Sequence, residues 1–414
     1  MGTETTLALQ LQVGSGAWVD VGYLHHAGNR NWFEFLDSYW RLGERPVLGQ
    51  IFEEHGRAWR PSARVALPHW FSHLLPEGRL RRAVAMAAHS HTVNEFELLK
   101  LLGPSDLQGA VRVVPADSRG EYLVPDGGHD DDVDRDDPLL KFSLAGVQLK
   151  FSIYADGKRL VVPARGLAGN VILKFPDERP SFSGVPEAEL ACLTLASRVG
   201  IDAAEAELVS PHDVLGLEDW ARRSSGMALA VKRFDRRDDD VRIHMEELAQ
   251  VMDIPTAVEG AKYTKANFET IGVLVAGLCG VDAVAAVIDR IVLNVLVGNG
   301  DAHLKNWAVR YVDGRTPVLS PLYDVLPTVL YLPGDNLGLN LAKSKSFEDV
   351  VPESFDRLGV RTGFGVKEAR QRATDAVDRV ADQWHVLADY LAADAYRGLT
   401  ARRDELAILR RTSG

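Results

Sequence analysis

A core helix that ends in a cluster of polar side chains is the feature that most constrains this chain. Residues 281–297 form an apolar run long enough for a core helix, and the segment GNGDAHLKN follows it from Gly298 to Asn306. Asp301 lies in this segment, and a second Asp, Asp324, follows another short apolar stretch. This order of Asp, Asn and Asp is the polar set of a phosphotransferase. The first Asp accepts the proton of the acceptor hydroxyl, and the other two residues bind Mg²⁺, which prefers oxygen ligands.

The same segment also has a simpler interpretation. A Gly-Asn-Gly-Asp sequence after an apolar run is typical of a turn. Asp301 and Asn306 are also good helix-capping residues. Taken alone, the segment does not separate a turn from a catalytic loop, and the choice depends on what lies upstream.

The first upstream feature is a turn made of small residues. Residues 142–153 predict a strand, a turn and a second strand. Small residues at the turn let the backbone approach a ligand, and successive N–H groups there would cradle a phosphate. An ordinary hairpin is the alternative. The residues of this predicted phosphate-binding turn are Ala145, Gly146, Val147, Gln148, Leu149 and Lys150.

A short apolar strand, residues 171–176, carries a single lysine, Lys174. Such a lysine would neutralise nucleotide phosphates, although a solvent-facing lysine gives the same pattern. Residues 187–199 fit a helix packed on that sheet, and we expect its Glu189 to pair with Lys174. Residues 227–237 then predict a buried strand that becomes charged abruptly, as a hinge between two lobes would. We expect residues 232–234 to contact an adenine; they are Lys232, Arg233 and Phe234.

This ordered set resembles the HipA family of serine/threonine kinases, the toxins of bacterial toxin–antitoxin modules. The kinase residues that carry the resemblance are Ser143, Gly146, Gln148, Lys150, Lys174, Glu189, Val231, Arg233, Phe234, Asp235, Arg236, Asn299, Asp301, His303, Lys305, Asn306, Tyr323 and Asp324. Residues typical of the family's N-terminal subdomain precede them, among them Leu67, Pro68, Phe71, Leu74, Gly103 and Gly109. The sequence departs from the family at three positions, where Leu149 replaces a common Glu, Met245 replaces Gln, and Lys232 replaces the Glu of some members.

The resemblance implies an α+β, two-lobed protein kinase-like (PI3/4-kinase-like) fold with an N-terminal α/β subdomain. The expected divisions are an N-terminal subdomain at 1–125, an acidic linker at 126–137, a small lobe at 138–238 and a helical large lobe at 239–414. Alternating leucines near residue 7 suggest strands at the start, and a helix is expected near residues 66–75. Later helices are expected at 268–278, 281–297, 369–391 and 393–409.

The resemblance also implies a Mg-ATP-dependent kinase that phosphorylates a protein Ser or Thr, an aminoacyl-tRNA synthetase being one target class. Asp301 would be the general base, Asn306 and Asp324 would bind Mg²⁺, and Ser143 would be an autophosphorylation site. Tyr323 would complete the ATP site, together with two residues whose roles stay open. His303 either contacts phosphate or supports the loop. Lys305 either stabilises the transferred phosphate or lies on the surface.

The implied partner is a helix-turn-helix antitoxin of the HipB type that binds operator DNA. A net charge of −11 argues against a large DNA-binding surface on this chain, so we expect DNA contact mainly through the antitoxin. No apolar run approaches the length of a membrane span, and no secretory signal is visible, which predicts a cytoplasmic protein. Two other classes stay open: a small-molecule kinase with the same core, and a catalytically silent co-repressor subunit.

Overall fold

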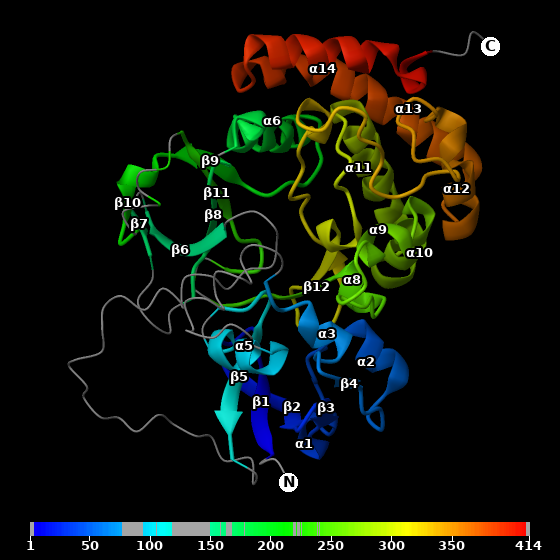
Figure 1. Ribbon diagram of the computed structural model, residues 1–414. Helices are drawn as coiled ribbons and strands as arrows, with labels where there is room; N and C mark the ends of the chain where they lie inside the picture. Colours follow the sequence, from blue (N-terminus) through cyan, green and yellow to red (C-terminus); the bar gives the residue numbers. More distant parts are fainter. Residues whose placement is uncertain are drawn as a thin grey trace.

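The structure is a computed structural model. It describes residues 4–410 except 77–93, 105, 118–149, 158, 163–167, 178, 218–220, 222, 223, 225, 238 and 240. The predicted acidic linker, Ser143 and the turn residues 145–149 therefore lie outside the described residues. Figure 1 shows an N-terminal sheet in blue and cyan, a second sheet in green, and a group of helices in yellow to red.

The N-terminal sheet has the strand order β4-β3-β2-β1-β5 within the described residues, and every neighbouring pair is antiparallel. The strand predicted from the alternating leucines is confirmed as β1, in which Leu7, Leu9 and Leu11 are buried. The strands are β1 (Thr5–Gln12), β2 (Trp18–Ala27), β3 (Arg30–Phe35), β4 (Ser62–Arg64) and β5 (Val111–Ala116). The helices of this part are α1 (Asp37–Trp40), α2 (Gln50–His55), α3 (His69–Ser72) and α5 (Glu95–Leu102).

The helix expected near residues 66–75 is much shorter than predicted. Pro68 stands directly before α3, and a proline ring disfavours helical backbone in the residue before it, so the helix starts only at His69. It ends at Ser72, yet Leu74 and Leu75 beyond it remain buried. The apolar pattern of residues 66–75 therefore indicates which residues are buried, and not how long the helix is.

The second sheet has the strand order β10-β7-β6-β8-β11-β9 in the part of the chain that is described. Its central strand β8 pairs antiparallel with both β6 and β11. Helix α6 (Val185–Arg198), the predicted helix that carries Glu189, leads from β8 to β9. The strands are β6 (Lys150–Asp156), β7 (Arg159–Val161), β8 (Val171–Lys174), β9 (Ala206–Val209), β10 (Val214–Leu215) and β11 (Ala228–Lys232).

Helices dominate the C-terminal part, as predicted. Helix α11 is buried over most of its length, and α13 and α14 lie across one end of the molecule in Figure 1. The helices are α8 (Leu248–Val251), α9 (Ala261–Thr264), α10 (Phe268–Cys279), α11 (Val284–Val297), α12 (Asp356–Thr362), α13 (Val366–Gln383) and α14 (Ala393–Glu405). A small antiparallel sheet was not predicted; its strands are β12 (His244–Glu247), β13 (Ala308–Tyr311) and β14 (Val318–Leu319).

Two large clusters and one small cluster of buried apolar residues form the core of the described part of the chain. The first lies around α10, α11 and α13 and also contains Cys192 and Leu195 of α6. The N-terminal sheet and the second sheet instead share one continuous core, in which Phe33 and Phe71 belong to the same cluster as Leu173. The N-terminal part is therefore packed on the second sheet. None of the described helices is long and apolar enough to cross a membrane.

Candidate active site

Two lysines and two carboxylates meet where the second sheet faces the helical part. Lys150 and Lys174 are direct antiparallel partners on β6 and β8, so their side chains lie on the same face of the sheet. Lys174 Nζ lies 2.5 Å from Glu189 Oε1 of α6 and 2.5 Å from Asp324 Oδ1. Lys150 Nζ lies 3.2 Å from Asp324 Oδ2. We call these four residues the phosphate-site cluster.

The electrostatics of this cluster favour the charged forms of Asp324 and Lys174. Burial disfavours a charged Asp324, but the two lysines outweigh it and hold the pKa of this carboxyl well below its usual range. Burial likewise disfavours a charged Lys174, yet Asp324 and Glu189 raise the pKa of its ammonium group. The side chain of Asp324 is 31% exposed, whereas those of Lys174 and Glu189 are 5% and 4% exposed. The cluster is therefore accessible mainly at Asp324.

Asp324 has an unusual backbone conformation. Its φ is 57°, in the left-handed region that residues other than glycine rarely adopt, although Asp tolerates this region better than most residues. The preceding Tyr323 donates its hydroxyl to the Lys305 carbonyl oxygen at 2.8 Å. This bond ties the Asp324 segment to the catalytic segment predicted from the sequence.

The catalytic segment begins where α11 ends at Gly298, in the left-handed conformation typical of a helix C-cap. The Asp301 N–H donates to Asn299 Oδ1 at 3.0 Å, and Asn306 Nδ2 donates to the Asp301 carbonyl oxygen at 2.7 Å. A Cβ atom on Gly300 would lie 2.1 Å from Asp335 Oδ2, so glycine is required there. These contacts fix the backbone on both sides of Asp301.

Asp301 itself projects toward solvent, with a side chain that is 53% exposed. Tyr263 of α9 donates its hydroxyl to Asp301 Oδ1, and His303 Nε2 lies 3.7 Å from the same oxygen. Partial desolvation raises the pKa of Asp301 although the Tyr263 hydrogen bond lowers it, and the nearby charge of Asp324 adds to the rise. The two aspartates therefore influence each other electrostatically.

His303 and Lys305 both point inward. His303 is buried, and burial together with Lys262 and Lys305 lowers its pKa to about 3, so the imidazole is neutral at pH 7. Lys305 is also buried, and its Nζ lies 3.6 Å from Glu247 Oε2. The interpretation of Lys305 as a surface lysine is wrong.

The three residues predicted at the adenine are placed differently from one another. The Lys232 side chain is exposed and lies 3.9 Å from Glu205. The backbone N–H groups of Lys232 and Arg233 bond to the carbonyl oxygens of Glu205 and Asn170. The Phe234 ring packs against Tyr323, with 5.3 Å between the ring centroids. Phe234 thus reaches the residue next to Asp324.

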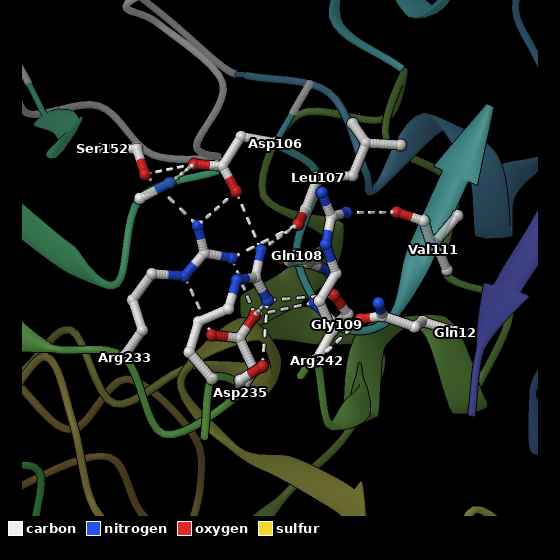
Figure 2. A network of polar contacts seen from close by, with 12 residues as sticks. Gln12, Asp106, Leu107, Gln108, Gly109, Val111, Ser152, Arg233, Asp235 and Arg242 are labelled. Atoms are coloured by element: carbon white, nitrogen blue, oxygen red, sulfur yellow. Dashed lines mark hydrogen bonds and ion pairs between the residues drawn. The ribbon is translucent and has the colours of Figure 1, made fainter. Parts of the chain in front are cut away.

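The Arg233 guanidinium belongs to a second charged cluster, shown in Figure 2. Arg233 bonds to Asp106 Oδ1 at 2.7 Å and to Asp235 Oδ2 at 2.7 Å, and Arg236 bonds to the same two oxygens at 2.8 and 2.9 Å. Arg242 donates to the Val111 carbonyl oxygen at 3.0 Å. We call Asp106, Arg233, Asp235, Arg236 and Arg242 the junction cluster, because it joins the N-terminal part to the end of β11.

Sequence reasoning missed several of these residues. Tyr263, Glu247 and Asp106 contact predicted site residues from segments distant in sequence, and no local motif marks them. Lys150 was assigned to a phosphate-binding turn, yet it begins strand β6. Pairing the two predicted strands in antiparallel register would have placed Lys150 opposite Lys174, and this was the signal that could have found it.

The oxygen atoms present suit a magnesium ion held jointly with a nucleotide. Among the described residues there is no cluster of three or more His, Cys, Asp or Glu side chains able to hold a metal by itself. Mg²⁺ usually takes one or two protein oxygens and completes its shell with phosphates and water. The partly exposed Asp324 carboxylate already attracts two cationic groups, and the Asn306 amide is fixed through its nitrogen, which leaves its oxygen as a ligand.

This chain is similar to known proteins over most of its length. Residues 142–384 match the HipA-like C-terminal domain, and residues 17–114 match the HipA N-terminal domain. The chain is 38% identical over 363 residues to a Sinorhizobium fredii protein named "Putative kinase Y4dM", with 86% of each chain covered. It is 30% identical over 350 residues to "Putative kinase Y4mE" of the same organism, covering 78% of this chain and 79% of that protein.

The fold is also similar to a solved structure. The HipA toxin of Shewanella oneidensis MR-1, solved with HipB and its operator DNA, superposes with a TM-score of 0.69 at 17% identity, covering 96% of this chain and 95% of that one. At this sequence identity the match shows only that the two proteins share a mixed α/β fold. The matches to the two HipA domain families and the identity to the Sinorhizobium relatives establish the family, and this chain belongs to the HipA family.

Proposed function

We propose that this chain is a Mg-ATP-dependent serine/threonine protein kinase and the toxin of a HipBA-type toxin–antitoxin module. One observation carries the proposal. The Asp324 carboxylate lies between Lys150 and Lys174, Lys174 is held by Glu189, and Asp301 lies within electrostatic reach. Phosphoryl transfer is mostly positioning and neutralisation of charge, and this set of residues supplies both.

In the proposed mechanism Lys174 and Lys150 bind the nucleotide phosphates, and Asp324 and Asn306 hold the metal. Mg²⁺, when bound, neutralises negative charge on the phosphates. Asp301 accepts the proton of the acceptor hydroxyl as that oxygen bonds to the γ-phosphorus, and the bond from the γ-phosphorus to the β,γ-bridging oxygen breaks, so that ADP leaves. The raised pKa of Asp301 makes it a better base than an ordinary aspartate.

The remaining predicted residues take supporting roles. Buried, neutral His303 lies beside Asp301 and supports the loop, and Lys305 neutralises charge at the transferred phosphate from its place beside Glu247. Backbone and ring atoms of residues 232–234 contact the adenine, with Phe234 packed on Tyr323. The phosphate-binding role predicted for residues 145–149 falls on a segment outside the described residues. The Arg233 guanidinium takes no part, because it is engaged in the junction cluster.

The acceptor is proposed to be a protein Ser or Thr, an aminoacyl-tRNA synthetase being one candidate target. The partner is a HipB-type antitoxin, as in the Shewanella complex, and it makes most of the operator DNA contacts. A net charge of −11 on this chain supports the proposal that the antitoxin makes most of the DNA contacts. Two arginines of α13, Arg372 and Arg379, both pair with the buried Asp289.

The test is transfer of radioactive γ-phosphate from ATP to proteins of a cell extract, with and without Mg²⁺. Mg²⁺-dependent labelling of protein on Ser or Thr supports the proposal. Labelling of a sugar or an antibiotic instead would identify a small-molecule kinase. Absence of any nucleotide turnover would identify a catalytically silent co-repressor subunit.

Ser143 is proposed as an autophosphorylation site that switches the enzyme off. A phosphate adds about −1.5 to −2 charges at neutral pH, close to where anionic ATP would bind, and so lowers ATP affinity. Mass spectrometry after incubation with Mg-ATP tests the modification. ATP binding by the modified protein and by Ser143→Ala then tests its effect. A Ser143 without phosphate, or equal ATP affinity of both forms, would refute this switch.

A further inference from the structure

The hydroxyl of Tyr263 occupies the place that an acceptor hydroxyl needs. General-base catalysis requires the hydroxyl of the acceptor to donate a hydrogen bond to the base before its proton is transferred. Tyr263 donates such a bond to Asp301 Oδ1, the oxygen that His303 also faces at 3.7 Å. A serine, a threonine or a water molecule would have to displace the phenol to reach this oxygen.

The backbone of Asp301 is held on both sides of the residue. Its N–H donates to Asn299 Oδ1, and Asn306 Nδ2 donates to its carbonyl oxygen. His303, which is buried, lies beside the carboxylate, with its Nε2 3.7 Å from Oδ1. The backbone of the base is therefore fixed where an acceptor hydroxyl must meet it, and Tyr263 is the group to be displaced.

Tyr263 is well placed to move. It lies on α9, a helix of only four residues that begins after Gly260, whose φ is 73°. Its side chain is only partly buried, and its ring meets His303 edge-on, with 4.9 Å between the centroids and 74° between the planes. Tyr263 belongs to none of the apolar clusters that the described residues form.

We propose that Tyr263 is the gatekeeper of the acceptor site. Its hydroxyl binds Asp301 Oδ1 in the free enzyme and keeps water from this one oxygen, and a protein acceptor displaces it when its own hydroxyl binds there. This inference rests on the proposed kinase function and adds how the acceptor site is kept closed. The chemical class of the displacing ligand is a hydroxyl-bearing side chain of a protein.

Hydrolysis of Mg-ATP by the purified full chain, without added protein, tests the gate. Tyr263→Phe keeps the ring and removes the hydroxyl, so water gains access to Asp301. A hydrogen bond to a charged group biases an equilibrium by about 10- to 100-fold, and we expect hydrolysis to rise about tenfold or more. Tyr396→Phe, which removes a hydroxyl from α14 at the edge of the helical core, should leave the rate unchanged.

The increase must also depend on the base. In the double variant Tyr263→Phe/Asp301→Asn the extra hydrolysis should disappear, while Mg-ATP still raises the melting temperature of every variant. An unchanged or lower rate for Tyr263→Phe overturns the gate, as does an increase that survives in the double variant. Phosphate found on Tyr263 by mass spectrometry would also overturn it, because the residue would then be an acceptor.

The failure of the gate is distinguishable from failure of the kinase proposal. If the wild-type protein turns over Mg-ATP and Tyr263→Phe does so no faster, only the gate is wrong. If the wild-type protein and both tyrosine variants neither bind nor hydrolyse Mg-ATP, the kinase proposal is wrong and the gate falls with it.

Discussion

The phosphate-site cluster and the junction cluster use the same kind of buried ion pair for different ends. Every member of the junction cluster is less than 9% exposed, and its arginines also donate to the backbone carbonyl oxygens of Leu107, Gly109 and Val111. The phosphate-site cluster is closed on the side of Lys174 and Glu189 but open at Asp324. Buried charge alone therefore does not mark a binding site.

Access and neighbours make the difference between the two clusters. Asp324 lies within electrostatic reach of Asp301, whereas Asp106 and Asp235 are enclosed by arginines that hold their pKa values below the usual range against the opposing effect of burial. We therefore expect changes in the phosphate-site cluster and the catalytic segment to cost activity. Changes in the junction cluster should cost stability.

The largest expected effect is on activity. Asp301→Asn keeps the shape of the side chain but removes the proposed base, and loss of a general base costs about 10²- to 10⁴-fold in rate. Because the side chain is half exposed, the melting temperature should change little. Steady-state kinetics and thermal unfolding of the same preparation check both parts. A near-normal rate would show that this loop has been assigned wrongly.

The second prediction concerns the junction cluster. Asp106→Ala leaves the buried guanidinium groups of Arg233 and Arg236 without one of their two carboxylates, which should lower the free energy of unfolding by about 3–5 kcal/mol. Denaturant unfolding measures this loss. The matched control is Asp239→Ala, which breaks an exposed pair with Arg237 and should change the free energy of unfolding little. Equal costs for the two variants would remove the distinction between buried and exposed pairs.

The third prediction concerns nucleotide binding. Lys174→Ala removes a positive charge from the proposed phosphate site and should weaken Mg-ATP binding about tenfold, or about 1.4 kcal/mol. The stabilisation by saturating ligand falls by the same amount, which a thermal-shift titration detects. Lys367→Ala on the exposed face of α13 serves as the control. If both variants respond to Mg-ATP as the wild type does, Lys174 has no phosphate contact.

The smallest effect tests a buried carboxylate that is held by neutral donors. Burial raises the pKa of Glu246 to about 7, although Tyr311, Trp70 and the Gln50 N–H all donate to it and favour the charged form. Because the folded pKa is raised, folding takes up a proton above the unfolded pKa of about 4.3. The stabilisation is complete below that pH and is lost as pH rises toward 7.

We therefore expect the free energy of unfolding to fall with rising pH between about 5 and 7, by on the order of 1 kcal/mol per pH unit from this group. Glu246→Gln, which cannot titrate, should give a flatter profile in denaturant melts at several pH values. Identical slopes for the two proteins would show that Glu246 stays ionised in the folded state.

Much of the fold was predictable because its signals are local. A periodic pattern of apolar residues that ends at a polar residue or a glycine predicts the strand with Lys174, the helix with Glu189 and the helix before Gly298. The structure pairs Lys174 with Glu189. The catalytic segment was found because its polar residues are consecutive. Strand β12 was missed, since Glu246 and Glu247 are polar residues that become buried only through contacts with Tyr311 and Lys305.

The rest of the site depends on contacts that no local pattern records. Arg233 was assigned to the adenine site because it directly follows the last residue of β11, but its guanidinium bonds to Asp106, which is distant in sequence, within the junction cluster. Tyr263 lies on a four-residue helix that carries no motif. Such contacts follow from how the two sheets and the helical part pack.

The most direct measurement is a crystal structure with Mg²⁺ and a non-hydrolysable ATP analogue. The account predicts that the phosphates lie at Lys150 and Lys174, that the Asp324 carboxylate binds the metal in place of at least one lysine contact, and that the bonds between Asp106, Arg233 and Asp235 persist. An analogue bound elsewhere, with both lysine contacts of Asp324 intact, would contradict the assignment of the phosphate-site cluster.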